Sequence, residues 1–168
     1  MYLYSLLAAA LAIILLFVVP KRAKVWVATA LISVAAIGAI ALSVLTLVEG
    51  KQELATFTTS LFGTERISVD GISALFLAII SIASIATVLY SRGYVKGYLE
   101  RFTAAHIALH YTALVMLVVS MMLVVVTSGG FSFLFSWELM TIASFILILF
   151  EADRQEVRRA ALNYLVMM

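Results

Sequence analysis

Long uncharged apolar runs alternate with short polar segments along this chain. Most of these runs are close to the length of about 20 residues that a helix needs to cross a bilayer. A transmembrane β-barrel is excluded, because its strands would alternate in polarity over about ten residues. The pattern predicts an all-α fold, a polytopic transmembrane helix bundle with five full spans plus the start of a sixth. The predicted spans are residues 2–19, 25–48, 71–90, 104–127 and 131–150, with the incomplete sixth at 160–168.

The polar segments define where these spans begin and end. Pro20 closes the first span, and Asp70 stands just before the third, where its carboxylate can accept free backbone N–H groups of the new helix. Residues 49–69 predict an exposed loop with Phe57 and Phe62 at the membrane interface. The final apolar run has about half the length of a span. We therefore expect the whole chain, 1–168, to be a single transmembrane domain and the amino-terminal portion of a longer subunit.

The third predicted span carries a narrow face of small polar residues. At 100° per residue, Ser73, Ser84, Thr87 and Ser91 fall on one side of the helix. Small polar side chains let helices approach closely and hydrogen-bond to one another in lipid. This face is expected to pack against other helices.

The composition supports the membrane interpretation and removes several chemistries. Hydrophobic residues make up 65% of the 168 residues and charged residues only 12%, against roughly 45–50% and about 25% in soluble domains. The sequence has no cysteine, which excludes disulfides, thiolate metal sites and thiol catalysis. The basic residues sit in short loops between spans, so membrane topology explains them better than a nucleic-acid partner does.

Lysine and arginine are distributed unequally between alternate polar segments. One side holds Lys21, Arg22, Lys24, Arg92, Lys96, Arg101, Arg154, Arg158 and Arg159, and the other side holds Lys51 and Arg66. Basic loops remain in the cytoplasm of membrane proteins. The predicted protein lies in the cell (inner) membrane with its amino terminus outside.

Glu138 is the acidic residue that lies well inside a predicted span. A carboxylate at mid-bilayer costs about 3 kcal/mol on insertion scales, so such a group needs a partner, water or a proton. Leu134, Thr141 and Phe145 share its helical face, and apolar neighbours favour the protonated form that a proton carrier needs. A structural carboxyl group that hydrogen-bonds a neighbouring helix is the alternative.

His106 and His110 are four residues apart and share one face of the fourth predicted span. A proton relay is one interpretation of the pair, and packing at the membrane interface is another. Two histidines without an acidic ligand nearby in sequence are a weak metal signal, and we expect no metal or cofactor.

Three segments together carry a family resemblance. Residues 69–76 read Val-Asp-Gly-Ile-Ser-Ala-Leu-Phe, residues 89–94 read Leu-Tyr-Ser-Arg-Gly-Tyr, and residues 133–140 read Phe-Leu-Phe-Ser-Trp-Glu-Leu-Met. In order and spacing they resemble the proton-translocating antiporter-type membrane subunits of respiratory complex I, formate hydrogenlyase-type hydrogenases and multi-subunit sodium/proton antiporters. The third segment is the most specific, because the family carries a Trp-Glu or Phe-Glu pair in the corresponding helix.

The resemblance implies that Glu138 is the proton-channel glutamate of the family, paired with a lysine on a later helix. It implies a proton-translocating subunit of a redox-driven complex, NADH:quinone oxidoreductase-like or hydrogenase-like, with other membrane subunits, the lipid bilayer and protons as partners. The redox chemistry would lie on those other subunits, because this sequence has no ligand set for flavin, iron–sulfur clusters or haem. Two alternatives stay open: a sodium/proton antiporter subunit without redox coupling, and a structural scaffold in which Glu138 only braces helices.

Overall fold

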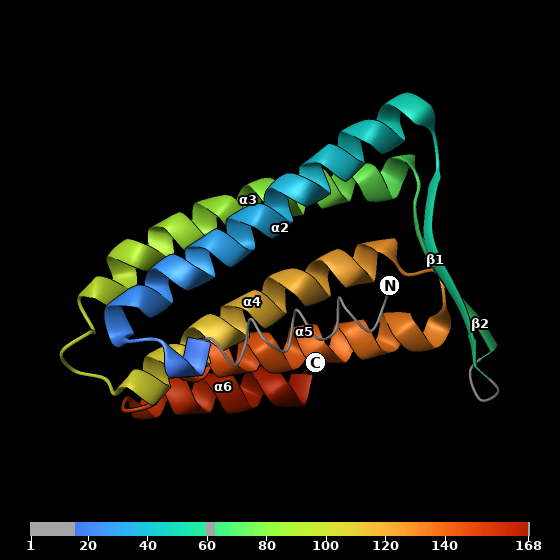
Figure 1. Cartoon of the computed structure of the whole chain (residues 1–168). Helices are drawn as coiled ribbons and strands as arrows, with labels where there is room; N and C mark the ends of the chain where they lie inside the picture. Colours follow the sequence, from blue (N-terminus) through green and yellow to red (C-terminus); the bar gives the residue numbers. More distant parts are fainter. Residues whose placement is uncertain (1–15, 60–62, 168) are drawn as a thin grey trace.

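A computed structural model describes residues 16–59 and 63–167 of the chain. Its elements are α2 (Lys21–Glu49), β1 (Gln52–Thr59), β2 (Gly63–Val69), α3 (Gly71–Lys96), α4 (Ala104–Val126), α5 (Gly130–Ile148), η1 (Leu149–Glu151) and α6 (Gln155–Met167). Figure 1 shows two antiparallel helix pairs, α2 with α3 and α4 with α5, and a β-hairpin beside one end of both pairs. The short helix α6 lies along α5.

Four helices among the described residues are long and apolar enough to cross a membrane, namely α2, α3, α4 and the segment Gly130–Glu151. Many large apolar side chains on their outer surfaces are exposed, as expected for surfaces that face lipid. The chain is therefore a multi-pass membrane protein. The predicted first span, 2–19, lies outside the described residues except for its last few, so the count of five full spans stays a prediction. The predicted start of a sixth span, 160–168, falls largely within the 13-residue helix α6, which is not one of the four candidate spans, so the sixth span also stays a prediction.

The prediction of an exposed loop at 49–69 is wrong, and the fold is therefore not purely helical. β1 and β2 form a two-stranded antiparallel sheet in this segment, with Phe57 opposite Glu65. Three threonines and Phe57 in β1, and Thr64, Ile67 and Val69 in β2, favour extended backbone. Gly63 begins β2 with a φ of +74°, a conformation that glycine adopts without steric cost. Phe57 is exposed as expected, and Phe62 lies outside the described residues.

The hairpin is tied to the turn between α4 and α5. The backbone N–H of Ser128 donates to the carbonyl of Arg66 at 3.0 Å, and Ile67 forms an isolated bridge with Thr127. The Ser128 hydroxyl donates to the same carbonyl, also at 3.0 Å. Main-chain hydrogen bonds thus join the β-hairpin, which connects α2 to α3, to the turn that connects α4 to α5.

α3 packs through a seam whose buried positions alternate in steps of three and four residues. They are Ala74, Leu77, Ser81, Ser84, Val88, Ser91 and Val95. This is the spacing of left-handed coiled-coil packing, and the facing helix is α2. Ser84 and Ser91 are buried as the sequence predicted, but Thr87 is exposed. α3 also continues past residue 90, where the sequence predicted its end, to Lys96.

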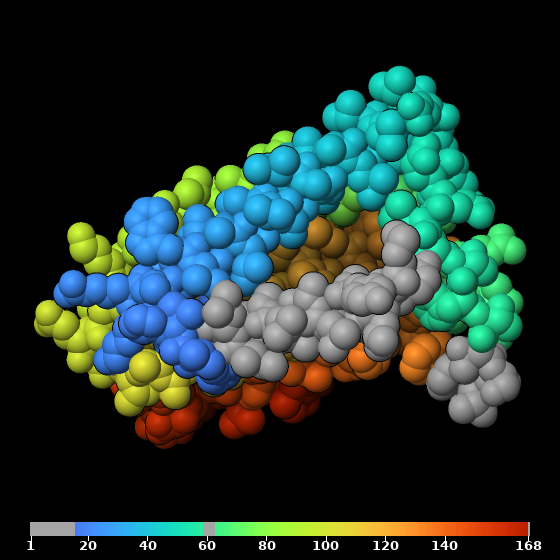
Figure 2. All heavy atoms as spheres, in the orientation of Figure 1, coloured from blue at the N-terminus to red at the C-terminus, as the bar shows by residue number. Residues whose placement is uncertain are grey.

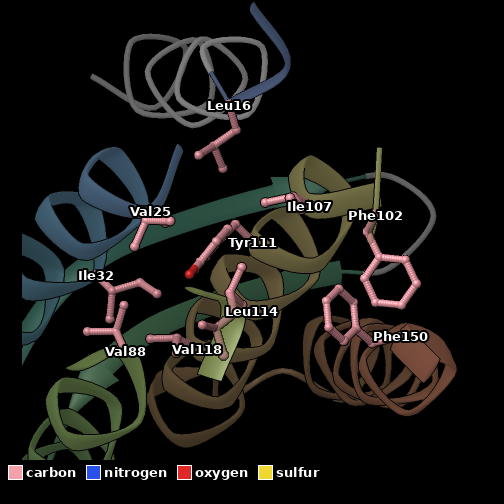
Figure 3. Packing of buried hydrophobic residues seen from close by; sticks show 12 residues of the cluster. Leu16, Val25, Ile32, Val88, Phe102, Ile107, Tyr111, Leu114, Val118 and Phe150 are labelled. Atoms are coloured by element: carbon pink, nitrogen blue, oxygen red, sulfur yellow. The ribbon is translucent and has the colours of Figure 1, made fainter. Parts of the chain in front are cut away.

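α4 is the central helix of the bundle. It packs against α5 and against both α2 and α3, and residues around its whole circumference are buried. Figure 3 shows Tyr111 of α4 pointing toward Val25 and Ile32 of α2, with Phe102 and Phe150 facing each other nearby. Lys24 is buried beside this core, where its ammonium donates to the backbone carbonyls of residues 16 and 17. Those carbonyls would otherwise lack partners at the end of a helix.

Candidate proton-transfer site

Glu138 lies near the middle of α5, about 12 Å along the helix axis from Gly130 at 1.5 Å per residue. The residue is exposed on the surface of the described chain. It forms no hydrogen bond or ion pair with any described residue, and no described lysine or arginine pairs with it. The carboxyl group predicted from the sequence is therefore at mid-span depth but has no partner within the described part of the chain.

The surface around Glu138 is apolar. Leu134, Phe135 and Ile142 are exposed on the same side of α5. Of the three residues predicted to share its face, Leu134 is exposed, Phe145 is half-buried and Thr141 is buried against the bundle. The hydroxyl of Thr141 donates to the carbonyl of Trp137 in its own helix, at 3.2 Å, rather than to Glu138. A charged carboxylate on this surface would be in contact with hydrocarbon unless another protein segment covers it.

His106 is held by aromatic rings and one hydrogen bond. Its ring stacks on Phe102 with centroids 4.3 Å apart and planes inclined by 5°. Its Nε2–H donates to the backbone carbonyl of Phe150 at 2.9 Å, which joins the start of α4 to the end of the α5 segment. This bond uses Nε2 of His106 and leaves the other nitrogen of the ring for a further partner.

His110 lies one turn deeper and is buried. Its Nε2 is 3.4 Å from the hydroxyl of Ser91 on α3, and its ring centroid is 4.4 Å from that of Phe150. The Nδ1 atom is buried without a hydrogen-bond partner among the described residues. Both histidines line one cavity of about 100 Å³ together with Leu109, Ile146 and Phe150. A cavity of this size is large enough to hold a water molecule, but apart from the two imidazole rings its lining is apolar, so a water there would have few hydrogen-bond partners.

Two tyrosines missed as functional residues lie beside this histidine cluster. The hydroxyls of Tyr94 and Tyr98 both donate to Oε1 of Glu151, Tyr94 at 3.0 Å. Both rings also contact Phe150. Tyrosines beside basic residues at the end of a span are typical of the membrane interface, and that pattern alone assigns them no functional role. The hydrogen bonds of the two tyrosines to Glu151 depend on α3 continuing past residue 90, which the sequence did not predict. The end of the α5 segment at Glu151 lies one residue beyond the predicted end at 150.

Glu138 and the histidine cluster are not brought together. Ile146, which lines the histidine cavity, is eight residues from Glu138, or about 12 Å along the helix axis. The histidines face the interior of the bundle, whereas Glu138 faces outward. No chain of hydrogen bonds between described residues connects them. Within the described ranges, moreover, no three His, Cys, Asp or Glu side chains are grouped as metal ligands.

Comparisons with known proteins give relatives but no function. No protein-family model matches the chain. It is similar to two uncharacterized proteins of Mycobacterium tuberculosis, one from strain CDC 1551 / Oshkosh and one from strain ATCC 25618 / H37Rv. Each is 37% identical over 103 residues, which is 61% of this chain and 15% of the relative. The match thus spans less than one sixth of the length of these curated relatives.

Proposed function

We propose that this chain belongs to a proton-translocating membrane subunit of a redox-driven complex, in which Glu138 accepts and releases the transferred proton. The observation that carries the proposal is the position of Glu138 near the middle of a membrane-spanning helix, on an apolar surface, without a partner in the described chain. An ionisable group in this setting is costly enough to indicate a function. The resemblance of residues 133–140 to antiporter-type subunits supports the same residue.

We infer that the counter-charge of Glu138 lies on another protein segment, because Glu138 is exposed and has no partner in the described chain. A lysine that approaches within about 4–6 Å would favour the carboxylate, and its withdrawal would favour the protonated acid. Proton uptake and release would then follow the movement or titration of that lysine. The electron-transfer steps take place on other subunits, and this chain contributes the proton-binding group.

The proposed orientation places the end of the bundle that holds Lys21, Arg92 and Arg159 in the cytoplasm, with the β-hairpin outside. The antiparallel helices bring nine of the eleven basic residues to that one end. In this orientation His106 and His110 lie near the cytoplasmic side of the membrane. They would exchange protons with that side through the cavity that they share.

Replacing Glu138 tests the proposal in the assembled complex. The variant Glu138→Gln keeps the size and polarity of the side chain but cannot carry a proton. We expect proton pumping driven by the electron donor to fall about a hundredfold or more in inverted vesicles, because positioned proton transfer contributes that much. Glu138→Asp should retain part of the activity, and Glu156→Gln, which removes an exposed carboxylate on α6, should retain all of it.

The other outcomes separate the alternatives. Unchanged pumping by Glu138→Gln in a fully assembled complex would show that the residue only braces helices. Sodium-dependent proton exchange in vesicles that lack an electron donor, lost in Glu138→Gln, would identify an antiporter subunit without redox coupling.

A further inference from the structure

A groove lies at the basic end of the bundle, away from Glu138. It has a volume of about 1020 Å³ and lies between the start of α2 and the end of α3. Figure 1 shows that these two helix ends lie at the same end of the molecule, and Figure 2 shows their surface atoms there in blue and yellow-green. We call this groove the basic groove.

Four cationic side chains line the basic groove, namely Lys21, Arg22, Arg92 and Lys96, together with the single carboxylate of Glu100. None of the four forms an ion pair with a carboxylate of the described chain. Lys21 donates to the backbone carbonyl of Phe102 at 2.9 Å, which fixes its ammonium at this position. The groove therefore has a positive charge that the described chain does not neutralise.

The lining of the basic groove is also partly apolar and includes an aromatic anchor. Val25, Leu89 and Leu99 line it together with the charged residues. Trp26 is 62% exposed, and the guanidinium carbon of Arg92 lies 3.9 Å from the centroid of its ring. A tryptophan beside basic residues at the end of a spanning helix is typical of the level at which lipid headgroups meet acyl chains.

We propose that the basic groove binds the headgroup of an anionic phospholipid. Its phosphate would lie among the guanidinium and ammonium groups, and the acyl chains would run down the exposed apolar surface of α2 and α3. Basic pockets between membrane helices recognise anionic headgroups, whereas a soluble phosphate would gain nothing from the apolar residues that line the groove. The proposal does not depend on the role of Glu138.

Trp26 supplies a reporter inside the groove. The chain has two tryptophans, so Trp137→Phe leaves Trp26 as the only one. This chain would be placed in phosphatidylcholine nanodiscs that contain increasing fractions of acyl-brominated phosphatidylglycerol or acyl-brominated phosphatidylcholine. We expect the anionic lipid to quench Trp26 at a several-fold lower fraction than the neutral lipid does.

Two matched charge variants separate the groove from general surface charge. Arg22→Gln with Lys96→Gln removes two charges from the groove, and Arg158→Gln with Arg159→Gln removes two charges from α6 at the same end of the bundle. Removing one groove charge should raise the fraction of anionic lipid needed to quench Trp26 by about fivefold. The first variant, which lacks two charges, should therefore need roughly 25-fold more anionic lipid. In the second variant the required fraction of anionic lipid should change by less than about twofold. If the first variant does not fold, Lys96→Gln alone should give the fivefold shift.

Four results would overturn the proposal. Equal quenching by the two brominated lipids would remove the selectivity, and equal losses in the two double variants would leave only general surface charge. Reversal of the quenching by inorganic phosphate, at an ionic strength matched with chloride, would assign the groove to a soluble anion. In intact membranes, a photo-crosslinking benzoylphenylalanine in place of Leu99 should yield a lipid adduct, and a protein adduct instead would assign the groove to an acidic partner.

Discussion

The carboxylate of Glu65 occupies the space into which a side chain at Gly129 would project. Glu65 lies on β2 and is only 4% exposed, although the sequence placed it in an exposed loop. One of its oxygens accepts the backbone N–H of Ser132 at 3.4 Å, in the first turn of α5. Since a helix N-terminus favours negative charge, this contact stabilises the start of the helix that carries Glu138.

The substitution Gly129→Ala should therefore displace Glu65 from the start of α5. A forced shift of this kind costs about 1–3 kcal/mol of the free energy of unfolding. In a Glu65→Ala background the same substitution should cost less, because the space is then free. A double-mutant cycle measured by reversible unfolding in micelles checks this, and strictly additive costs would show that the two residues do not interact.

Phe150 joins the aromatic cluster at the basic end of the bundle. Its ring lies within about 6 Å of those of Tyr94, Tyr98, Phe102, His106 and His110. Phe150→Ala should lower the free energy of unfolding by about 3 kcal/mol, because it removes packing that the neighbouring rings cannot replace. Phe135→Ala is the matched control. That residue is exposed on α5, and its loss should change the free energy by less than about 0.5 kcal/mol.

Asp70 caps α3, as the sequence predicted. Its Oδ1 accepts the backbone N–H of Ser73 at 2.8 Å, and this bond is the main cause that lowers the pKa of Asp70 from its ordinary value of 3.8. A lowered pKa in the folded state means that the carboxylate stabilises the fold above the unfolded-state pKa. That stabilisation is lost as the pH falls through the folded-state pKa.

The pH dependence of Asp70→Asn tests this cap. Asparagine also caps helices but does not titrate. The stability advantage of the original chain over the variant should be constant near neutral pH and should shrink once the pH falls below about 4. Unfolding measured in micelles from pH 7 to pH 3 gives this difference directly. A difference that does not change over this range would contradict the assignment.

The absence of cysteine from the sequence allows a direct test of orientation. Lys51→Cys places one thiol beside the hairpin, and Arg159→Cys places one on α6 at the opposite end, both at exposed positions. In intact cells a membrane-impermeant maleimide should label the first variant, and it should label the second only after lysis. The reverse pattern would place the basic end outside.

The spanning helices were predictable because hydrophobic length alone determines them. The predicted 104–127 agrees closely with α4 (Ala104–Val126). The hairpin was not predicted, because Glu53, Glu65 and Arg66 make its sequence resemble a solvated loop, and its stability depends on contacts with the α4–α5 turn. The additional turns of α3 were missed for a similar reason, since Tyr94 and Lys96 are polar, whereas Val95 between them is buried against the bundle.

The depth of Glu138 followed from its sequence position, but the direction in which it points did not. Its direction depends on which side of α5 packs against α4, and α5 is apolar on nearly every side. The same ambiguity explains why Thr87 was assigned to a packed face and Ser81 was not. The cationic lining of the basic groove was visible in the sequence only as a topology signal, because its residues come from the ends of two helices.

The joint between the β-hairpin and the α4–α5 turn relies on main-chain atoms at residues 66, 67, 127 and 128. Every amino acid except proline can supply those atoms. Homologous chains could therefore keep the main-chain part of the joint with other side chains at residues 127 and 128, provided that residue 128 is not proline. Such a change at residue 128 would lose the bond from the Ser128 hydroxyl to Arg66, unless threonine replaced the serine. Evolutionary change is restricted instead at the adjoining pair, Glu65 and Gly129. A larger residue at position 129 would require a smaller one at position 65.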